Sequence, residues 1–313
     1  MKALVGYTGF VGSNLDSATI FDGRYNSKNI SEAFGTSPEL LIYAGVPAAK
    51  YLANSAPEKD FEFILQAQEN IKKISPKKLV LISTIDVFKN PVKVDETSEV
   101  DIEGLQAYGK NRRYLEIWVQ ENFSDALIVR LPGLFGKNIK KNFIYDFIKK
   151  IPFRLTEKIF SQLCGKESAL KNFYVLQENN FYQCKNLVGE EEKILRAVFE
   201  RLNFSALNFT DSRSVYQFYP LSRLWRDIEI ALKNDLKLLN LATEPVQISE
   251  LYSYLTGKTF INELSNIPAN YDFQTKFAKL FGGDGSYLID KNAVMKSIAD
   301  FIQNFGDKDA RKA

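Results

Sequence analysis

Residues 107–116 read AYGKNRRYLE and place Tyr108 four residues before Arg112. On a helix, this spacing puts both side chains on one face, about one turn apart. A neighbouring positive charge lowers the pKa of a phenol, which at its ordinary value of ~10 is a poor base at neutral pH. Lys110 lies roughly 200° around the helix from Tyr108 and cannot replace Arg112. The pattern predicts an acid/base tyrosine assisted by Arg112; the alternative is a solvated arginine beside a tyrosine that only packs.

The sequence contains no histidine, which restricts the remaining chemistry. Ser-His-Asp and Cys-His nucleophile systems are excluded, as is any metal held by histidine. Two cysteines, Cys164 and Cys184, make neither a disulfide framework nor a metal site. We therefore expect no metal, and proton transfer must use Tyr, Lys, Asp or Glu.

A glycine-rich loop, GYTGFVGSNL (6–15), directly follows a strand-like run and precedes a helix-like one. Its glycines recur every third residue, unlike the GxGxxG spacing of many dinucleotide sites. Glycines permit a tight turn and close approach of the backbone to a pyrophosphate, and the following helix offers free N–H groups. The flanking elements favour this interpretation over a turn without function. We expect cofactor contacts from Gly6, Thr8, Gly9, Phe10, Val11 and Gly12.

The end of the second strand should meet the adenine ribose of a dinucleotide. We expect this strand at 23–27, so that its end supplies Asn26, Ser27 and Lys28. An acidic residue there would hold the ribose hydroxyls of NAD. Its absence slightly favours NADP over NAD, with Arg24 or Lys28 meeting the 2′-phosphate; surface charge without function is equally consistent. Asp22 would reverse the preference if the strand ended earlier.

The elements that must position these groups follow from short apolar runs at 3–5, 39–45, 78–83 and 126–131. Amphipathic helices are expected between them, at 59–74 and 112–123. One face of the first helix should carry Phe61, Leu65, Gln68 and Ile71. Continuous apolar strands that alternate with helices are typical of a parallel sheet buried on both faces. The sequence thus predicts an α/β protein with a Rossmann-like, doubly wound sheet.

A change of composition after residue 136 suggests a second region, richer in Lys, Asn and Phe. We expect an NAD(P)-binding domain at 1–136, to which the chain returns at about 214–246. A smaller substrate-binding region would comprise 137–213 and 247–305. The polar end, 306–313, is expected to form a flexible tail.

Blocks of sequence in this order resemble the extended short-chain dehydrogenase/reductase family, of the NAD-dependent epimerase/dehydratase group, over most of the chain. No single block is specific to this family, but the occurrence of all of them in the family's order is. The blocks are GYTGFVG (6–12), IYAG (42–45), LISTIDVF (81–88), AYG (107–109), RLPGLFG (130–136), YQFYPLSRLWRDIEIAL (216–232) and LNLATEPVQISEL (239–251).

The resemblance implies roles for the matching positions. Thr84 would share a hydrogen bond with the substrate oxygen and Tyr108 would pass the proton, while hydride moves between the cofactor and the same carbon. Thr84 could instead be a strand-end hydroxyl that satisfies local backbone. The positions expected to line the cofactor are Ala44, Gly45, Ser83, Pro132, Gly133 and Leu134.

The chain departs from the family pattern at Arg112, where the family has a lysine that contacts the nicotinamide ribose. Arginine is planar and bulkier, but it keeps its charge. We expect Arg112 to contact the ribose and to keep Tyr108 usable, at an altered rate. Thr84 is followed by Ile85 and Asp86 rather than the Asp-Glu of dehydratases, which makes an elimination less expected. The arginine that helps bind a substrate diphosphate in the family is missing from its place, although Arg213 lies three residues before it.

These features predict an NAD(P)-dependent oxidoreductase or epimerase acting on a carbonyl or alcohol of a small polar, sugar-like or nucleotide-sugar molecule. The alternative is a catalytically silent NAD(P)-binding sensor or scaffold. A net charge of +3 with interspersed signs favours neither nucleic acid nor a membrane surface as a partner. Few cysteines and the lack of an apolar run of ~20 residues suggest the cytoplasm. The family resemblance also makes a homodimer possible.

Overall fold

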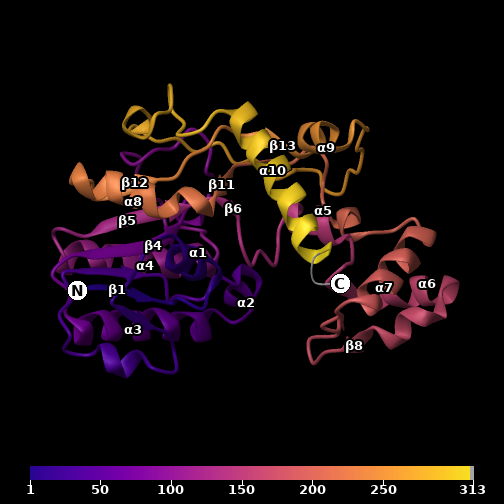
Figure 1. Ribbon diagram of the computed structural model, residues 1–313, viewed down its shortest axis with the longest axis horizontal. Coiled ribbons are helices and arrows are strands. Elements are labelled where there is room, and N and C mark those ends of the chain that lie inside the picture. The colour runs from indigo at the N-terminus through magenta and orange to yellow at the C-terminus, as the bar shows by residue number, and fades with distance from the viewer. Residues whose placement is uncertain (311–313) are drawn as a thin grey trace. The chain divides into compact units, whose positions relative to one another are not determined.

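The computed structural model describes residues 1–310, and the side chains of residues 1–305. The chain divides into two compact units (Figure 1). Unit 1 comprises residues 1–139, 215–246 and 269–297, and unit 2 comprises 140–214, 247–268 and the chain from 298 onward.

Unit 1 is built on a six-stranded sheet with the order β12-β5-β4-β3-β1-β2, in which every pairing is parallel. The predicted Rossmann-like, doubly wound sheet is confirmed. Strand order reverses between β1 and β3, the position at which open α/β sheets bind ligands beyond the carboxyl ends of their strands. The strands are β1 (Lys2–Val5), β2 (Gly23–Tyr25), β3 (Leu40–Tyr43), β4 (Leu79–Thr84), β5 (Leu127–Leu131) and β12 (Leu238–Asn240).

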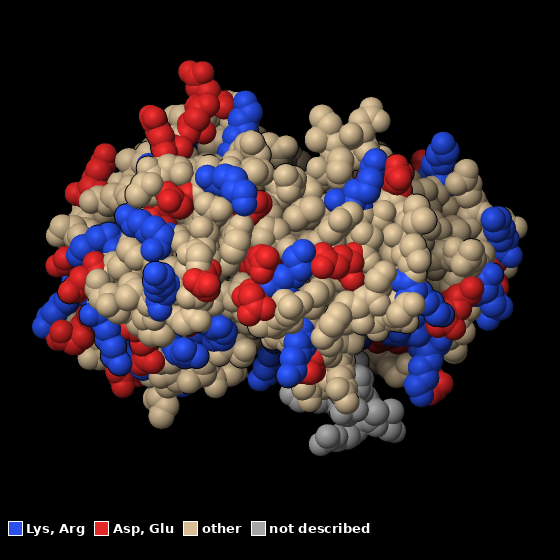
Figure 2. All heavy atoms as spheres, turned by 90° about the horizontal axis from the view of Figure 1, so that it is seen from above, with Lys and Arg blue, Asp and Glu red and all other residues tan. Residues whose placement is uncertain are grey.

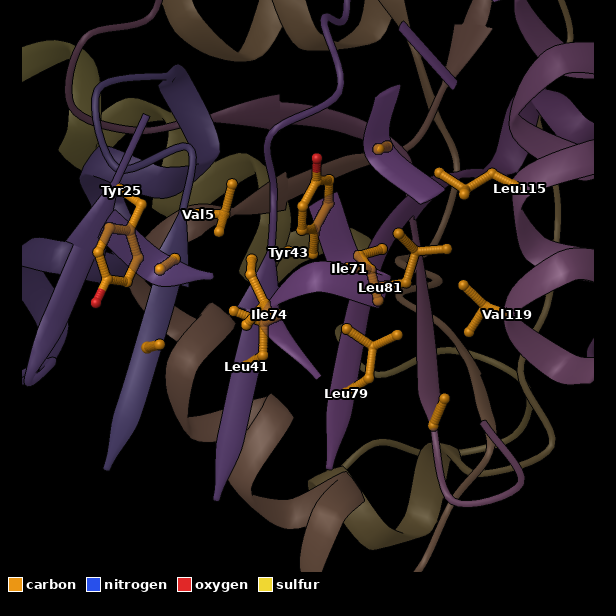
Figure 3. Packing of buried hydrophobic residues seen from close by; sticks show 14 of the residues in the cluster. Val5, Tyr25, Leu41, Tyr43, Ile71, Ile74, Leu79, Leu81, Leu115 and Val119 are labelled. Atoms are coloured by element: carbon orange, nitrogen blue, oxygen red, sulfur yellow. The ribbon is translucent and has the colours of Figure 1, made fainter. Parts of the chain in front are cut away.

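Helices cover both faces of this sheet. Because side chains alternate along a strand, Val5, Tyr43 and Leu81 project to one face, where they pack with Ile71 and Leu115 of two long helices (Figure 3). These helices are α3 (Pro57–Ile74) and α4 (Ala107–Asn122), whereas α1 (Phe10–Ala18) and α8 (Leu224–Lys233) pack on the other side. In Figure 1, α3 lies below the strands and α8 above them.

The predicted apolar face of α3 is confirmed at Phe61, Gln68 and Ile71 and wrong at Leu65. Ile64, Ile71 and Ile74 are fully buried, whereas Leu65 is 45% exposed. Ile64, rather than Leu65, is buried against the sheet at this turn of the helix.

A buried ionic cluster fastens α4 to the sheet. The Glu116 carboxylate accepts hydrogen bonds from Arg130 Nε (3.0 Å) and Nη2 (2.7 Å), and from Ser83 Oγ (2.6 Å). Arg113 Nη1 donates to the same carboxylate at 3.0 Å. Glu116 and Arg130 are at most 1% exposed, and a buried charge is tolerated only when paired in this way. The cluster thereby fixes the helix that carries Tyr108.

Unit 2 contains a small antiparallel sheet of order β7-β9-β8 and its own apolar core around Leu155, Leu195 and Phe199. Its elements are α5 (Phe143–Lys149), β7 (Arg154–Thr156), α6 (Glu157–Lys166), β8 (Tyr174–Leu176), β9 (Phe181–Cys184), α7 (Glu190–Arg201) and α9 (Ile248–Thr256). Helix α10 (Lys291–Ala310) begins in unit 1 and ends in unit 2.

One domain boundary differs from the sequence prediction. Residues 269–297 were expected in the smaller region with the rest of 247–305, but they group with unit 1. The reason is backbone pairing: the N–H groups of Tyr271, Asp272 and Gln274 donate to carbonyls of Val215, Pro91 and Val94. In the expected flexible tail, residues 306–310 are helical, and 311–313 lie outside the described residues.

Shorter elements complete the chain. Two further two-stranded sheets pair β6 (Gly133–Phe135) with β11 (Phe218–Pro220), and β10 (Val215–Tyr216) with β13 (Val246–Gln247). Helix α2 spans Lys50–Ser55, and single 3₁₀ turns lie at Ile30–Ala33, Ile85–Val87 (η2), Ser168–Asn172, Ala206–Phe209, Leu221–Arg223 and Ala278–Phe281. No helix within residues 1–310 has the length and apolarity to cross a membrane. On the face shown in Figure 2, acidic and basic side chains are interspersed.

Candidate active site

The glycine loop lies between the end of β1 and the start of α1, at the carboxyl edge of the sheet. Helix α1 has no side-chain N-cap and no acidic residue in its first turn. Its first N–H groups, including those of Phe10 and Val11, are therefore available to an anion, and the helix dipole favours negative charge there. Thr8 and Gly9 are exposed beside them.

Two glycines of this loop are required by close backbone contacts. Gly6 has φ +91°, and a Cβ there would lie 2.4 Å from the carbonyl oxygen of Ala44. A Cβ on Gly12 would lie 2.0 Å from the carbonyl oxygen of Gly6. The loop is thus folded tightly against β3 and the first turn of α1, as a phosphate-binding turn must be.

The structure shows where the residues expected near the adenine ribose lie at the end of β2. The strand ends at Tyr25 rather than at residue 27, and the Asn26 side chain caps the next turn by accepting from Lys28 N at 2.9 Å. Asp22 precedes the strand and pairs with the backbone N–H of Lys2 at 2.6 Å, at the opposite edge from the glycine loop. Arg24 is held by Asp16. Ser27 and Lys28 are exposed, and no bond to the Lys28 ammonium is found within the described part of the chain.

The ends of β3, β4 and β5 bring the other expected residues to the same edge. Ala44 and Gly45 follow β3, and Pro132 and Leu134 flank Gly133, whose N–H donates to Gln217 O at 3.1 Å. Ser83 is separated from this group. Its side chain points to the α4 side of the sheet and donates to Glu116, so its hydroxyl is already committed.

Thr84 and Tyr108 are brought together. Both side chains are 8% exposed, and the Thr84 hydroxyl lies near enough to the Tyr108 phenol to affect its pKa. Burial raises the pKa of Tyr108; the Arg112 charge opposes this, the Asp86 carboxylate raises the pKa further, and the Thr84 hydroxyl and Lys50 lower it. The Thr84 hydroxyl also accepts from the backbone N–H of Asp86 at 3.2 Å.

Arg112 lies over the ring of Tyr108, with its guanidinium carbon 4.0 Å from the ring centroid. Nη1 donates to Asp60 and to the Tyr108 carbonyl oxygen (3.2 Å), and Nη2 donates to Asp60 (2.9 Å) and to the Pro47 carbonyl. Each terminal nitrogen has two protons, so all four are used within the protein. A ribose contact through either terminal nitrogen would have to displace one of these partners.

Replacing Arg112 with methionine is expected to lower the free energy of unfolding by about 3–5 kcal/mol, because Asp60 would be left buried without its partner. Urea denaturation followed by circular dichroism measures the effect. Lys110→Met removes the same charge from an exposed position of the same helix and should change stability by less than about 0.5 kcal/mol. Equal stabilities of the two variants would contradict a stabilising role for this pair.

Three further side chains lie close to Tyr108, and sequence reasoning assigned them no role at the site. Lys50, Asp86 and Tyr271 form mutual hydrogen bonds beside Thr84. The position of Lys50 shortly after β3 could have predicted its place at the site, because residues that follow parallel strands lie at one edge of the sheet. Tyr271 offered none, because it is 185 residues from Asp86 in sequence.

Comparisons with known proteins identify this architecture. No family model matches the sequence, and no curated protein matches it. Among solved structures, a UDP-N-acetylglucosamine 4-epimerase from Methanobrevibacter ruminantium M1, in complex with UDP-N-acetylmuramic acid, superposes with a TM-score of 0.64 at 12% identity over 98% of this chain and 100% of that chain. The chain has the fold of a nucleotide-sugar epimerase.

Two other structures share this epimerase fold. One is a UDP-glucose 4-epimerase with UDP-glucose from Thermotoga maritima (TM-score 0.62, 14% identity, 98% of this chain and 99% of that chain). The other is a dTDP-4-dehydrorhamnose reductase in complex with NADP from Bacillus anthracis (TM-score 0.61, 16% identity, 97% of this chain and 99% of that chain). The fold resemblance expected from the sequence blocks is therefore confirmed over nearly the whole chain.

Proposed function

We propose that the protein is an NAD(P)-dependent oxidoreductase or epimerase that acts on a carbonyl or alcohol of a small polar substrate. The observation that carries the proposal is the proximity of two buried hydroxyls, Thr84 and Tyr108, at the carboxyl edge of the sheet. At this edge β1 also ends in the glycine loop. An acid/base phenol and a phosphate-binding turn on one edge are what hydride transfer with a dinucleotide requires.

The glycine loop and the first turn of α1 fit a pyrophosphate, because the backbone there is tightly folded and its N–H groups are free of side-chain caps. Ala44, Gly45 and residues 132–134 would flank the nicotinamide. When bound, this group supplies or accepts the hydride. Lys28 supports NADP over NAD, as the exposed cation after β2 that can meet a 2′-phosphate.

The proton path follows from the positions of the two hydroxyls. In carbonyl reduction, the Tyr108 O–H gives its proton to the substrate oxygen as hydride reaches the carbon. In the reverse direction, the phenolate takes the proton from the alcohol. Thr84 would hold that oxygen by a second hydrogen bond, which orients it toward Tyr108.

Nucleotide sugars are the substrate class suggested by the names of the structural neighbours, which include UDP- and dTDP-sugar enzymes. Within unit 2, Arg213 is held by Asp211 (2.8 and 3.0 Å), and it also contacts Ser265 O and Glu263. This arginine is therefore a poor candidate for a diphosphate ligand. We propose a small sugar-like carbonyl or alcohol as the wider class, of which nucleotide sugars are one member.

The proposal is tested with purified protein, NAD, NADP and a panel of sugar and nucleotide-sugar carbonyls. We expect one dinucleotide to raise the melting temperature more than the other at matched concentration, since a ligand that binds the native state stabilises it. We also expect stereospecific transfer of deuteride from 4-deuterated NAD(P)H to one of the panel compounds. A protein whose melting temperature responds to neither dinucleotide would overturn the proposal.

A catalytically silent NAD(P)-binding protein is the second candidate. The observation that favours it is the commitment of every terminal Arg112 proton to Asp60, Pro47 and Tyr108, which leaves no terminal N–H for a ribose. Tight binding of a dinucleotide, without deuteride transfer to any compound of a broad carbonyl panel, would favour this function over the first.

A further inference from the structure

Lys50, Asp86 and Tyr271 form a closed triangle of hydrogen bonds in unit 1. The Lys50 ammonium lies 2.9 Å from Asp86 Oδ1 and 3.3 Å from the Tyr271 hydroxyl, which itself donates to Asp86 Oδ1 at 2.9 Å. Asp86 is 20% exposed and Lys50 is 43% exposed. Burial raises the pKa of Tyr271 far above its ordinary value, so this hydroxyl keeps its proton and remains a donor.

The backbone of the same aspartate lies against the helix of Tyr108. A Cβ on Gly109, the residue after Tyr108, would lie 2.0 Å from the carbonyl oxygen of Asp86. The Asp86 N–H donates to the Thr84 hydroxyl at 3.2 Å. The backbone of Asp86 is thus fixed against both Thr84 and the start of α4.

An unpaired carboxylate at this place would oppose formation of a phenolate on Tyr108. Two like charges in one partly buried site destabilise each other, whereas a cation beside the carboxylate offsets the effect. The other cation near the phenol, Arg112, lowers the pKa of Tyr108 but pairs with Asp60 rather than with Asp86. Lys50 reaches Asp86 directly.

We propose that Lys50 neutralises Asp86 beside Tyr108, and that Tyr271 holds the two in contact, so that the phenol can change its protonation state during the reaction. This inference rests on the proposed function of Tyr108 as the acid/base group. Lys50, Asp86 and Tyr271 are positioning residues in this scheme. The titratable and charged groups around the phenol are Arg112, which is paired with Asp60, and the triad of Lys50, Asp86 and Tyr271. The Tyr271 ring also stacks on that of Tyr216.

The direction in which each substitution should shift the pKa of Tyr108 follows from the charge that it removes. Lys50→Met leaves the carboxylate uncompensated and should raise the pKa of Tyr108. Asp86→Asn removes the negative charge and should lower it. The double variant removes both charges, so its titration should return close to that of the wild type. Lys50→Arg keeps the charge and should resemble the wild type.

The test uses a fluorinated tyrosine incorporated at position 108, whose phenol titrates at a lower pH than tyrosine and is followed by ¹⁹F NMR. The titration is recorded for the wild type, Lys50→Met, Asp86→Asn, the double variant and Lys50→Arg. Lys110→Met, which removes an exposed lysine from α4, is the control and should leave the midpoint unchanged. A Lys50→Met midpoint no higher than that of Lys110→Met would overturn the proposal, as would a double variant that keeps the full Lys50→Met shift.

The pH dependence of turnover gives a second measurement. In the reducing direction, activity falls as Tyr108 loses its proton, so the basic limb should move to higher pH in Lys50→Met and to lower pH in Asp86→Asn. ¹⁹F titrations that follow the charge scheme without any measurable turnover would support the inference and contradict the catalytic function. Turnover that depends on Tyr108 but has the same pH profile in all the variants would contradict the inference alone.

Discussion

Tyr108→Phe is expected to lower the turnover number about 10²–10⁴-fold, the usual contribution of general acid/base catalysis. The substitution removes one oxygen from a side chain that is 8% exposed, and the ring stays beneath the Arg112 guanidinium. Dinucleotide affinity should remain unchanged, because the glycine loop lies on a different part of the sheet edge. Steady-state kinetics and dinucleotide titration, monitored by fluorescence, separate the two quantities.

A matched control for this variant is Tyr114→Phe. Tyr114 lies on the same helix but is 46% exposed, and its ring contact with Phe61 does not need the hydroxyl. This variant should keep the wild-type turnover number. Full activity of Tyr108→Phe on an identified substrate would show that the phenol is not the acid/base group.

The second large effect is expected from Gly12→Ala, which should weaken dinucleotide binding at least about tenfold, or by about 1.4 kcal/mol. The added Cβ would lie 2.0 Å from the Gly6 carbonyl oxygen and 3.0 Å from the Tyr7 Cα. Neither neighbour is a flexible side chain, so the loop backbone itself must move away from α1. The N–H groups that would hold the pyrophosphate then lose their common orientation.

Isothermal titration calorimetry with NAD and NADP measures this loss, and circular dichroism checks that the variant is folded. Gly165→Ala is the control, since Gly165 lies in α6 and a Cβ there meets no atom within 4 Å. It should bind the dinucleotide as the wild type does and gain slightly in stability. Wild-type affinity in Gly12→Ala would rule out the glycine loop as the binding turn.

The positions of most strands of unit 1 could be predicted from the local pattern of apolar residues. Strands β1, β3, β4 and β5 are continuous apolar runs, as strands buried on both faces must be, and each was placed within a residue or two. The face of α3 was placed wrongly at Leu65, because Leu65 and Ile64 satisfy a helical period almost equally well. Only packing against the sheet chooses between them.

Prediction of the site was less complete, for a physical reason. The spacing of Tyr108 and Arg112 correctly placed both side chains together, since it depends on helix geometry alone. The partner of Arg112 is Asp60, 52 residues earlier, and no local rule connects the two. The same holds for Ser83, whose commitment to Glu116 depends on how α4 lies on the sheet.

The hydrogen bonds of Tyr271 also set an order in which the site can be completed. A ribosome makes the glycine loop, Thr84, Asp86 and Tyr108 long before Tyr271, which joins Lys50 across 221 residues of sequence. The intervening chain includes most of unit 2. A nascent chain can therefore pair β1 to β5 and bring the phenol near Thr84 while the Lys50–Asp86 pair still lacks its third member. The group proposed to transfer the proton is in place early, and its electrostatic surroundings are completed only when a much later segment has been synthesised.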